Sequence, residues 1–518
     1  MLFSSALFVF GFLPVVLGVN FVLPRALRNV WLLLASLVFY AWGEPVIALV
    51  MLASIAVNYG LGLLVARASS ARGARGVLVA AVAFNLGLLV FFKYADWLWS
   101  GFGALLEAFG FAPGGWAPLG SHLASDSPWR TILLGSGDAI RLPIGISFFT
   151  FQALSYVIDV HLREGRAQKS PLDFGLYIAL FPQLIAGPIV RYRDVARELA
   201  RRTVTRAGFA AGVRRFVLGL AKKMLVANLC AEAADGIFGT DTLAGVPAGE
   251  LTPALAWLGI AAYTLQIYFD FSGYSDMAIG LGLLFGFRFL ENFDYPYVAR
   301  SIREFWRRWH ISLSSWFRDY LYVPLGGNRR GPARTYANLL VVFVLCGLWH
   351  GANLTFLVWG LYHGAFLVLE RIGLGAWLAR RPAALRHLYV LLVVMLGWVF
   401  FRAASLGQAC DYLAALVGLH DGSQLVSVGA RSHPAAAVHL LAAHAHRLTW
   451  LALAAGVLGA IPWLPRVVAF TQRVRSEGRA GLALALESGG LLALVLLFVH
   501  VALALASGGY NPFIYFRF

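Results

Sequence analysis

The chain has 518 residues, of which 60% are hydrophobic and 13% are charged, and its formal net charge is +17 at pH 7. Soluble globular proteins are typically about 45–50% apolar and about 25% charged, whereas disordered chains combine low hydrophobicity with high net charge. Both classes are therefore excluded, and a polytopic membrane protein remains. Because the arginines alternate with apolar runs and do not form one face, we also expect no nucleic-acid binding.

Runs of about 20 apolar residues mark candidate membrane spans. Backbone polar groups must be satisfied inside the bilayer, so we expect these spans to be helices. We predict an all-α polytopic membrane protein with roughly eleven transmembrane helices, plus re-entrant and interfacial helices, in one domain over residues 1–518. The candidate runs lie near 3–23, 30–49, 50–66, 77–93, 142–160, 172–190, 251–270, 335–350, 352–370, 387–402, 448–464 and 484–506.

Orientation follows from the positive-inside rule, under which short loops rich in Lys and Arg lie in the cytoplasm. The stretches 94–141 and 231–250 are acidic, so we expect them outside, together with the N-terminus. The basic stretches, which we expect inside, are 25–28, 67–75, 163–169, 371–386 and 466–479.

The run 172–190 breaks the alternation, because basic residues flank it on both sides. It also contains Pro182, Gly187 and Pro188, which interrupt a helix. Non-helical backbone at membrane depth is tolerated only where protein or a cavity satisfies it. We predict a re-entrant hairpin, and a kinked ordinary span is the alternative.

The segment 207–229 is apolar but carries four cations. Taken alone, it is typical of an amphipathic helix at the membrane interface. If 231–250 lies outside, however, the chain must cross the membrane between Arg202 and that loop, so part of this segment could be a span. The sequence leaves both alternatives open. The cations are Arg214, Arg215, Lys222 and Lys223.

The densest basic block is 288–334, which is also rich in aromatic residues. It cannot be an ordinary span, and we expect short helices and a turn at Gly326-Gly327-Asn328. Such a surface suits anionic lipid heads or a polyanionic ligand such as a nucleotide cofactor. The alternative is that these charges serve only inside-positive topology. The arginines are Arg288, Arg300, Arg303, Arg307, Arg308, Arg318, Arg329, Arg330 and Arg334.

His350 ends the apolar run 335–350, directly before the next run. An ionisable residue at membrane depth is costly and is therefore a functional candidate, and a neutral imidazole can act as a general base near pH 7. The alternative is a histidine bonded to helix backbone. Cys346 lies on the same helix face, which permits a Cys–His nucleophile pair, although free cysteines are usually buried hydrophobes.

His310 is the second candidate, because it lies among the arginines and aromatic residues of the basic block. An interface-anchoring histidine is the alternative. Asp270 and Asp276 lie between apolar runs, where polar packing inside the protein is the favoured interpretation. The three cysteines form no metal-binding pattern, and no Walker or Rossmann loop occurs. We therefore expect no metal site and no permanently bound cofactor.

Several stretches together resemble the membrane-bound O-acyltransferase (MBOAT) family, in particular the bacterial branch with the alginate O-acetylase membrane component. Each stretch alone is weakly specific, but they are spread over most of the chain. Besides the acidic pair 270–276, they are 34–42 (LASLVFYAW), 143–152 (PIGISFFTFQ), 181–189 (FPQLIAGPI), 309–314 (WHISLS), 320–328 (YLYVPLGGN), 348–353 (LWHGAN) and 511–516 (NPFIYF).

The resemblance implies a multi-helical fold around a central tunnel. It implies that His350 is the catalytic histidine and that His310 is the second active-site residue, which positions the substrate or polarises the carbonyl. Acetyl-CoA is then the donor, and we expect its binding residues to be Arg307, Arg308, Trp309 and Asn328.

The same resemblance implies a bacterial inner membrane protein that works with a periplasmic acyltransferase partner. A polysaccharide is the final acceptor, alginate first, with peptidoglycan or cellulose as alternatives. Two rival functions remain from the residues alone. One is a transporter of a lipid or acyl group without catalysis, which would also need broken helices and intramembrane polar groups. The other is a catalytically silent scaffold of an export complex.

Overall fold

The computed structural model describes residues 1–514 except Glu44, 112–115, 124–126, 128–129, 131–132, 135–137, 241–242 and 420–445. Every regular element in these described residues is helical, as the sequence predicts. The chain forms two compact units. Unit 1 comprises residues 1–2, 7–209 and 281–290, and unit 2 comprises 3–6, 210–280 and 291–518. The expectation of a single domain over 1–518 stays a prediction.

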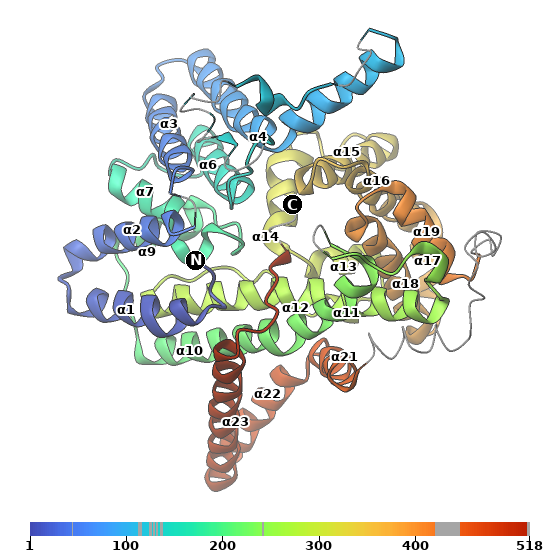
Figure 1. Ribbon diagram of the computed structural model, residues 1–518. Coiled ribbons are helices and arrows are strands. Elements are labelled where there is room, and N and C mark those ends of the chain that lie inside the picture. The colour runs from blue at the N-terminus through green and yellow to red at the C-terminus, as the bar shows by residue number, and fades with distance from the viewer. Residues whose placement is uncertain are drawn as a thin grey trace. The chain divides into compact units, whose positions relative to one another are not determined.

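Unit 1 contains the N-terminal helices, in which α3, α4 and α6 pack side by side (Figure 1). The predicted run 77–93 belongs to a much longer helix, so the stretch expected to begin an outer loop at residue 94 is helical as far as Ala108. The elements are η1 Leu7–Phe12, α1 Leu13–Val22, α2 Arg25–Ala41, α3 Ala48–Arg67, α4 Ala71–Ala108, η2 Leu119–His122, α6 Ile146–His161, α7 Pro171–Ala179, α8 Phe181–Leu184 and α9 Tyr192–Ala200.

The run 172–190 is broken, as its prolines and glycine predict. α7 has nine residues and is about 14 Å long at 1.5 Å per residue, too short to cross a bilayer alone. Protein groups satisfy the non-helical backbone: Ser36 Oγ accepts a hydrogen bond from the N–H of Phe181 at 3.1 Å. Residues 174–190 are buried throughout. This is the protein-enclosed irregular backbone that a re-entrant segment requires.

Unit 2 contains the remaining helices, with α15 beside α16 and α22 beside α23 (Figure 1). They are α10 Arg206–Ala221, η3 Lys222–Ala227, α11 Asn228–Phe238, η4 Ala248–Glu250, α12 Pro253–Phe285, η5 Pro296–Val298, α13 Ile302–Arg308, α14 Ile311–Phe317, η6 Arg318–Tyr322, α15 Pro332–His350, α16 Leu354–Leu369, η7 Glu370–Leu374, α17 Gly375–Ala379, α18 Ala383–Arg402, α19 Leu406–Leu416, α21 Arg447–Gly459, α22 Trp463–Ser476 and α23 Ala480–Ala506. The basic block 288–334 forms the expected short helices and turn.

The bounds of two predicted segments of unit 2 differ in the structure. The candidate span near 251–270 is confirmed as part of a helix that is long and apolar enough to cross a membrane, but α12 continues past Asp270 and Asp276 to Phe285. The stretch 231–250 is not simply an outer loop, because α11 occupies it as far as Phe238. Asp235 on α11 and Asp270 and Asp276 on α12 are buried and paired with cations, so they do not interrupt the helices.

The segment 207–229 is continuous helix with its neighbours, since α10, η3 and α11 follow one another from Arg206 to Phe238. The helical rise of 1.5 Å per residue gives this stretch a length of about 50 Å. Length therefore permits the membrane crossing that the topology prediction requires.

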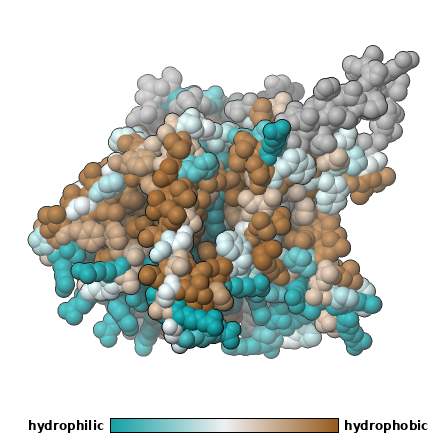
Figure 2. All heavy atoms as spheres, turned by 90° about the horizontal axis from the view of Figure 1, so that it is seen from below, coloured by the Kyte–Doolittle hydropathy of each residue, from teal (hydrophilic) through white to brown (hydrophobic). Residues whose placement is uncertain are grey.

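Among the described residues, seven helices are long and apolar enough to cross a membrane, or up to eight if α21 and α22, bent by 54°, form one span. The chain is thus a multi-pass membrane protein, although the predicted count of eleven is not confirmed. α2 and α6 are helical but have only 17 and 16 residues. Hydrophobic side chains cover much of the surface visible in Figure 2. On the last helix, for example, Leu484 and Leu503 are 62% and 64% exposed.

Glycines allow α15 and α16 to approach each other closely. A Cβ added at Gly360 would lie 2.3 Å from the carbonyl oxygen of Phe343, and one at Gly347 would lie 2.3 Å from that of Phe356. In membranes, small residues at helix interfaces permit this backbone contact. His350 ends one helix of the pair, so the contact also determines where its imidazole lies.

We predict that Gly360→Ala destabilises the protein by about 1–3 kcal/mol, the usual cost of overpacking. The matched control is Gly87→Ala, because an added Cβ there meets nothing within 4 Å; loss of the glycine in that helix should be neutral or stabilising by up to about 1 kcal/mol. Thermal unfolding in detergent measures both variants. An equal melting temperature for Gly360→Ala and Gly87→Ala would contradict this account of the interface.

Candidate active site

His350 is placed by the junction between α15 and α16. Gly351 follows it with extended backbone (φ −170°, ψ 159°) and ends α15. Asn353 then caps α16, because its Oδ1 accepts a hydrogen bond from the N–H of Thr355 at 3.0 Å. The imidazole is 7% exposed and contacts the rings of Trp349, Phe356, Trp359 and Phe401.

His310 lies in the turn between α13 and α14, in a left-handed backbone conformation (φ 43°, ψ 57°). That region is uncommon for residues other than glycine and costs of the order of 1–3 kcal/mol. The surrounding structure must therefore hold it. One restraint is the backbone of Asn292, whose carbonyl accepts a hydrogen bond from the N–H of Ile311 at 2.9 Å.

The side chain of Asn292 sets the chemical form of His310. Its Oδ1 accepts from the backbone N–H of Ser312 at 3.2 Å and lies 3.1 Å from Nδ1 of His310. Because a backbone N–H can only donate, this oxygen is an acceptor, and Nδ1 of His310 must carry the proton. Nε2 is then the unprotonated nitrogen, and it has no hydrogen-bond partner in the described part of the chain. The amide nitrogen of Asn292 donates to Ser275 Oγ at 3.0 Å.

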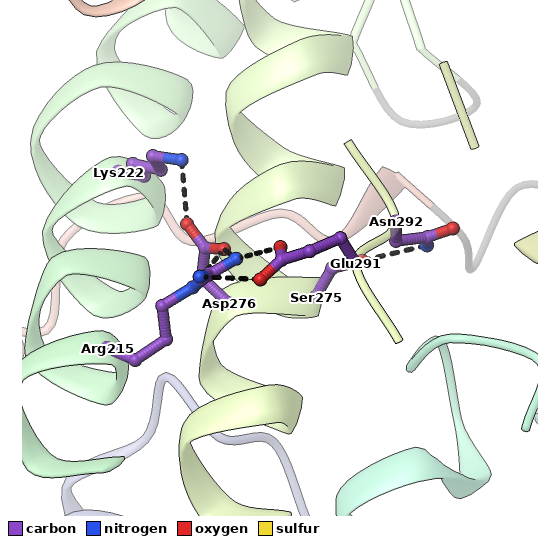
Figure 3. A network of polar contacts seen from close by, with 6 residues as sticks. All are labelled: Arg215, Lys222, Ser275, Asp276, Glu291 and Asn292. Carbon is purple, nitrogen blue, oxygen red and sulfur yellow. Dashed lines mark hydrogen bonds and ion pairs between the residues drawn. The ribbon is translucent and has the colours of Figure 1, made fainter. Parts of the chain in front are cut away.

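An ion-pair network holds both chain segments that Asn292 connects (Figure 3). Asp276, next to Ser275 on α12, accepts from Lys222 Nζ and Arg215 Nε, each at 2.7 Å. Arg215 also pairs with Glu291, the neighbour of Asn292. Asp276 is therefore a structural residue, as the sequence interpretation favoured.

Asp270 has the same kind of role one turn and a half earlier on α12. It pairs with Lys223 at 2.8 Å, and its Oδ2 accepts from the backbone N–H of Ile514 at 2.8 Å. Lys223 also donates to the carbonyl of Pro512. These bonds fix the C-terminal segment 511–514; Tyr515 and Phe516 of the matching motif lie outside the described residues.

His310 and His350 line the same two small cavities, together with Trp309. The larger has a volume of about 100 Å³ and is also lined by Cys346, and the smaller measures about 20 Å³. Since a water molecule occupies about 30 Å³ of liquid, the larger cavity has room for a small group such as an acetyl, not for a nucleotide. The other residues around them are Ile267, Phe271, Trp306, Leu313, Ser314, Phe317, Val342, Phe343, Trp359, Trp398, Phe401 and Ile514.

A larger cavity of about 520 Å³ lies on another side of His350. Phe356 and Phe401, whose rings contact His350, also line this cavity. Its polar lining includes Asn353 and Arg402. The rings of Phe356 and Phe401 therefore lie between His350 and this cavity of about 520 Å³, which is large enough for part of a bulky molecule.

Arg402, which lines that cavity, pairs with Asp235 in the stretch 231–250, which the sequence predicts to be an acidic outer loop. This carboxylate is 1% exposed, pairs with Arg402 at 2.8 Å and accepts from the hydroxyl of Tyr510 at 2.7 Å. Burial of the pair keeps α11 helical here.

The predicted donor-binding residues do not all gather at the histidines. Trp309 lines both small cavities. Arg307 and Asn328 are exposed and line neither cavity. Arg308 is held by Asp294 at 2.9 Å and Glu304 at 3.0 Å. Binding of a donor by these side chains stays a prediction.

Burial lowers the pKa of His310 to about 3. The imidazole is therefore neutral at physiological pH, in agreement with a proton on Nδ1 alone. A neutral ring with a bare Nε2 can accept a hydrogen bond from a substrate or another side chain, but this nitrogen cannot donate one to a carbonyl oxygen.

Comparison with known proteins agrees with this architecture. The model of the MBOAT, membrane-bound O-acyltransferase family matches residues 143–405. The chain belongs to this family. It is 40% identical over 521 residues to the probable alginate O-acetylase AlgI of Pseudomonas putida, with all of both chains covered. It is 36% identical over 458 residues to the peptidoglycan O-acetyltransferase of Helicobacter pylori, covering 82% of this chain and 81% of the relative. It is also similar to the teichoic acid D-alanyltransferase of Bacillus subtilis, at 29% identity over 40% of this chain and 53% of the relative.

In this O-acyltransferase both histidines predicted from the sequence line one site. Asn292 also belongs to this site, but the sequence did not predict it. It lies in Glu291-Asn292-Phe293-Asp294, a polar stretch that is typical of a surface loop. Eighteen residues separate it from His310, so no helical or strand spacing connects the two. Only the fold brings them together.

We predict that this O-acyltransferase becomes less stable as the pH decreases, and that His310 contributes to this loss. The unfolded histidine has a pKa near 6.5 and the folded one a pKa of about 3, so the unfolded state binds the proton first as pH falls. Between those values each pH unit costs up to about 1.4 kcal/mol. Thermal unfolding from pH 7 to 5 should therefore be less pH-dependent in His310→Gln than in the wild type. Equal slopes would refute the buried neutral imidazole.

Proposed function

We propose that this O-acyltransferase transfers an acetyl group from acetyl-CoA toward an extracytoplasmic polysaccharide, with alginate as the first candidate acceptor. The observation that carries the proposal is the pair His310 and His350 around a cavity of acetyl size. Similarity over the whole chain to a probable alginate O-acetylase supports the acetyl group and the acceptor class. The second acceptor candidate is peptidoglycan, because a peptidoglycan O-acetyltransferase also aligns over most of the chain.

In the proposed reaction, His350 removes the proton from the acceptor hydroxyl. The oxygen attacks the thioester carbonyl carbon, the C–S bond breaks, and the departing sulfur takes the proton from the imidazolium. An acetyl ester and free CoA result. General-base catalysis of this kind contributes about 10²–10⁴ in rate.

His310 is proposed as a hydrogen-bond acceptor that orients the reacting groups through Nε2. Its low pKa makes it a poor proton acceptor near neutral pH, since an effective general base has a pKa close to the operating pH. His310 therefore keeps the positioning role expected from the sequence, whereas a bare Nε2 cannot polarise the carbonyl by donating a hydrogen bond. It also leaves the base role to His350.

The two substrates reach the histidines from different sides in this proposal. The basic block 288–334 offers charge for the CoA phosphates, and Arg307, two residues before Trp309, is one of its exposed arginines. The acceptor approaches through the cavity of about 520 Å³ beyond Phe356 and Phe401. In this proposal the protein lies in the bacterial inner membrane, with CoA on the cytoplasmic side and a periplasmic acyltransferase partner on the other side. The reaction uses no permanently bound cofactor.

The first test is His350→Ala. In purified protein supplied with labelled acetyl-CoA and an acceptor, transfer should fall by about 10²–10⁴-fold, with protein level and melting temperature close to those of the wild type. Cys346→Ala is the companion variant, since Cys346 lines the same cavity; it should retain transfer if no Cys–His nucleophile pair operates. Wild-type transfer rates in His350→Ala would exclude His350 as the base. A wild-type protein that does not consume acetyl-CoA would instead favour a transporter or scaffold.

The second test distinguishes an arginine that attracts the donor from an arginine that stabilises the fold of the basic block. Arg307→Gln should raise the KM for acetyl-CoA several-fold while kcat changes little, because an exposed cation contributes attraction to the donor rather than to the reacting atoms. Arg308→Gln should instead lower thermal stability, since it breaks the bonds to Asp294 and Glu304. An unchanged KM in Arg307→Gln would argue against a CoA entrance here.

A further inference from the structure

Unit 1 contains a cavity that the transfer reaction does not use. It has a volume of about 300 Å³ and lies where the end of α1, the start of α2 and the segment after α9 meet. Its lining is unusually basic, with four arginines and two asparagines, namely Arg25, Arg28, Arg201, Arg202, Asn20 and Asn29.

The positive charge in this arginine cavity is poorly compensated. Within the described residues, none of its four arginines forms an ion pair with a carboxylate. Arg28 donates to backbone carbonyls instead, at 3.1 Å and 3.4 Å. The carboxylate nearby is that of Asp173, which accepts from Asn29 at 2.7 Å. Like charges that gather without counter-charges are stabilised by a bound anion.

Arg202 is the most constrained of these cations. Its Nε donates to the carbonyl of Phe285 at 3.0 Å, and one Nη donates to Oδ1 of Asn29. Its other terminal nitrogen is buried without a hydrogen-bond partner. Burial and the charge of Arg28 lower the pKa of Arg202 to about 10, so it is still charged at neutral pH. An unsatisfied buried donor costs about 1–3 kcal/mol, and more when it is charged.

The start of α2 adds a second source of positive potential. Pro24 precedes the helix, no side chain caps it, and its first turn contains no acidic residue. The partial positive charge at a helix N-terminus favours anions and disfavours cations. Arg25 and Arg28 nevertheless lie in this first turn. An anion in the cavity would offset the repulsion between these cations and the positive end of the helix.

Asn20 provides an independent sign of a ligand. Its side chain lines the cavity, is 1% exposed, and has an Oδ1 without a hydrogen-bond partner. Buried polar groups are nearly always hydrogen-bonded. The unpaired oxygen of Asn20 can accept a hydrogen bond from a hydroxyl group of a ligand, while the amide nitrogen can donate to a phosphate oxygen.

We propose that the arginine cavity binds the phosphate of an anionic phospholipid. Phosphate oxygens match the fork of a guanidinium. Large apolar side chains border the same helix ends, since Phe21, Val22 and Leu27 are 42%, 87% and 50% exposed. A phospholipid satisfies both surfaces, with its phosphate among the arginines and its acyl chains along the apolar border. The positive-inside prediction for 25–28 assigns this lipid to the cytoplasmic leaflet.

The test uses the purified full-length protein in a neutral detergent. Phosphatidylglycerol should raise the melting temperature and remain bound in native mass spectrometry. Phosphatidylcholine and inorganic phosphate, added at the same concentration, should do so much less. Equal effects of phosphatidylglycerol and phosphatidylcholine would overturn the anion site, and a full effect of inorganic phosphate alone would overturn the lipid as its source.

Arg202→Gln and Arg25→Gln should each weaken retention of phosphatidylglycerol by about tenfold or more, as expected for the loss of a charge-assisted hydrogen bond. Arg466→Gln is the matched control, because it removes an exposed arginine on α22 outside this cavity. Retention that falls equally in all three variants would indicate nonspecific attraction to the basic protein and contradict the site.

Asn20→Asp keeps the proposal testable if the arginine variants fold poorly. It supplies a carboxylate inside the cavity and should therefore raise the melting temperature without lipid and abolish the response to phosphatidylglycerol. Asn20→Ala controls for loss of the amide and should not raise it. A less stable Asn20→Asp that still responds fully to phosphatidylglycerol would contradict an anion site.

Discussion

The hydrogen bond between Asn292 and His310 is the interaction on which the candidate site depends. It places the proton of the buried imidazole on Nδ1 and leaves Nε2 as a buried acceptor without a partner, in a ring that lines the cavities shared with His350. The amide that makes this bond is itself held from both sides, by Ser275 on α12 and by the ion pairs of Asp276 and Glu291. The ion pairs of Asp276 and Glu291 thus help to determine, through Asn292, which nitrogen of the neutral His310 ring carries the proton.

The same site depends on backbone that departs from regular helix. His310 occupies a left-handed conformation, and His350 ends α15 where Gly351 is extended. Polar groups in irregular segments of a membrane protein must be satisfied by protein or by a cavity. Here aromatic rings surround both histidines, and surroundings of low polarity strengthen the electrostatic interactions between buried groups. The fold therefore combines positions that a continuous transmembrane helix could not offer.

Much of the fold was predictable because hydrophobic length has one physical meaning in a bilayer. The run 335–350 is helix α15 and ends at His350, and the prolines of 172–190 break their helix where expected. The helix bounds differ from the prediction where charge is buried in pairs. α12 continues through Asp270 and Asp276, and α11 includes Asp235, because these carboxylates pair with cations that are distant in sequence, namely Lys223, Lys222, Arg215 and Arg402. For the same reason the two histidines were predictable from their apolar or aromatic surroundings, whereas Asn292 was not.

The most direct test is a double-mutant cycle on kcat for acetyl transfer, with Asn292→Ala, His310→Ala and the combined variant. If Asn292 acts by holding the His310 tautomer, its substitution should slow the wild type by about tenfold or more, a loss typical of a supporting hydrogen bond in an active site. The same substitution should then have little further effect in the His310→Ala background, because residues that act as a unit are not additive. An equal loss from Asn292→Ala in both backgrounds would show that Asn292 acts independently of His310, and would contradict the account.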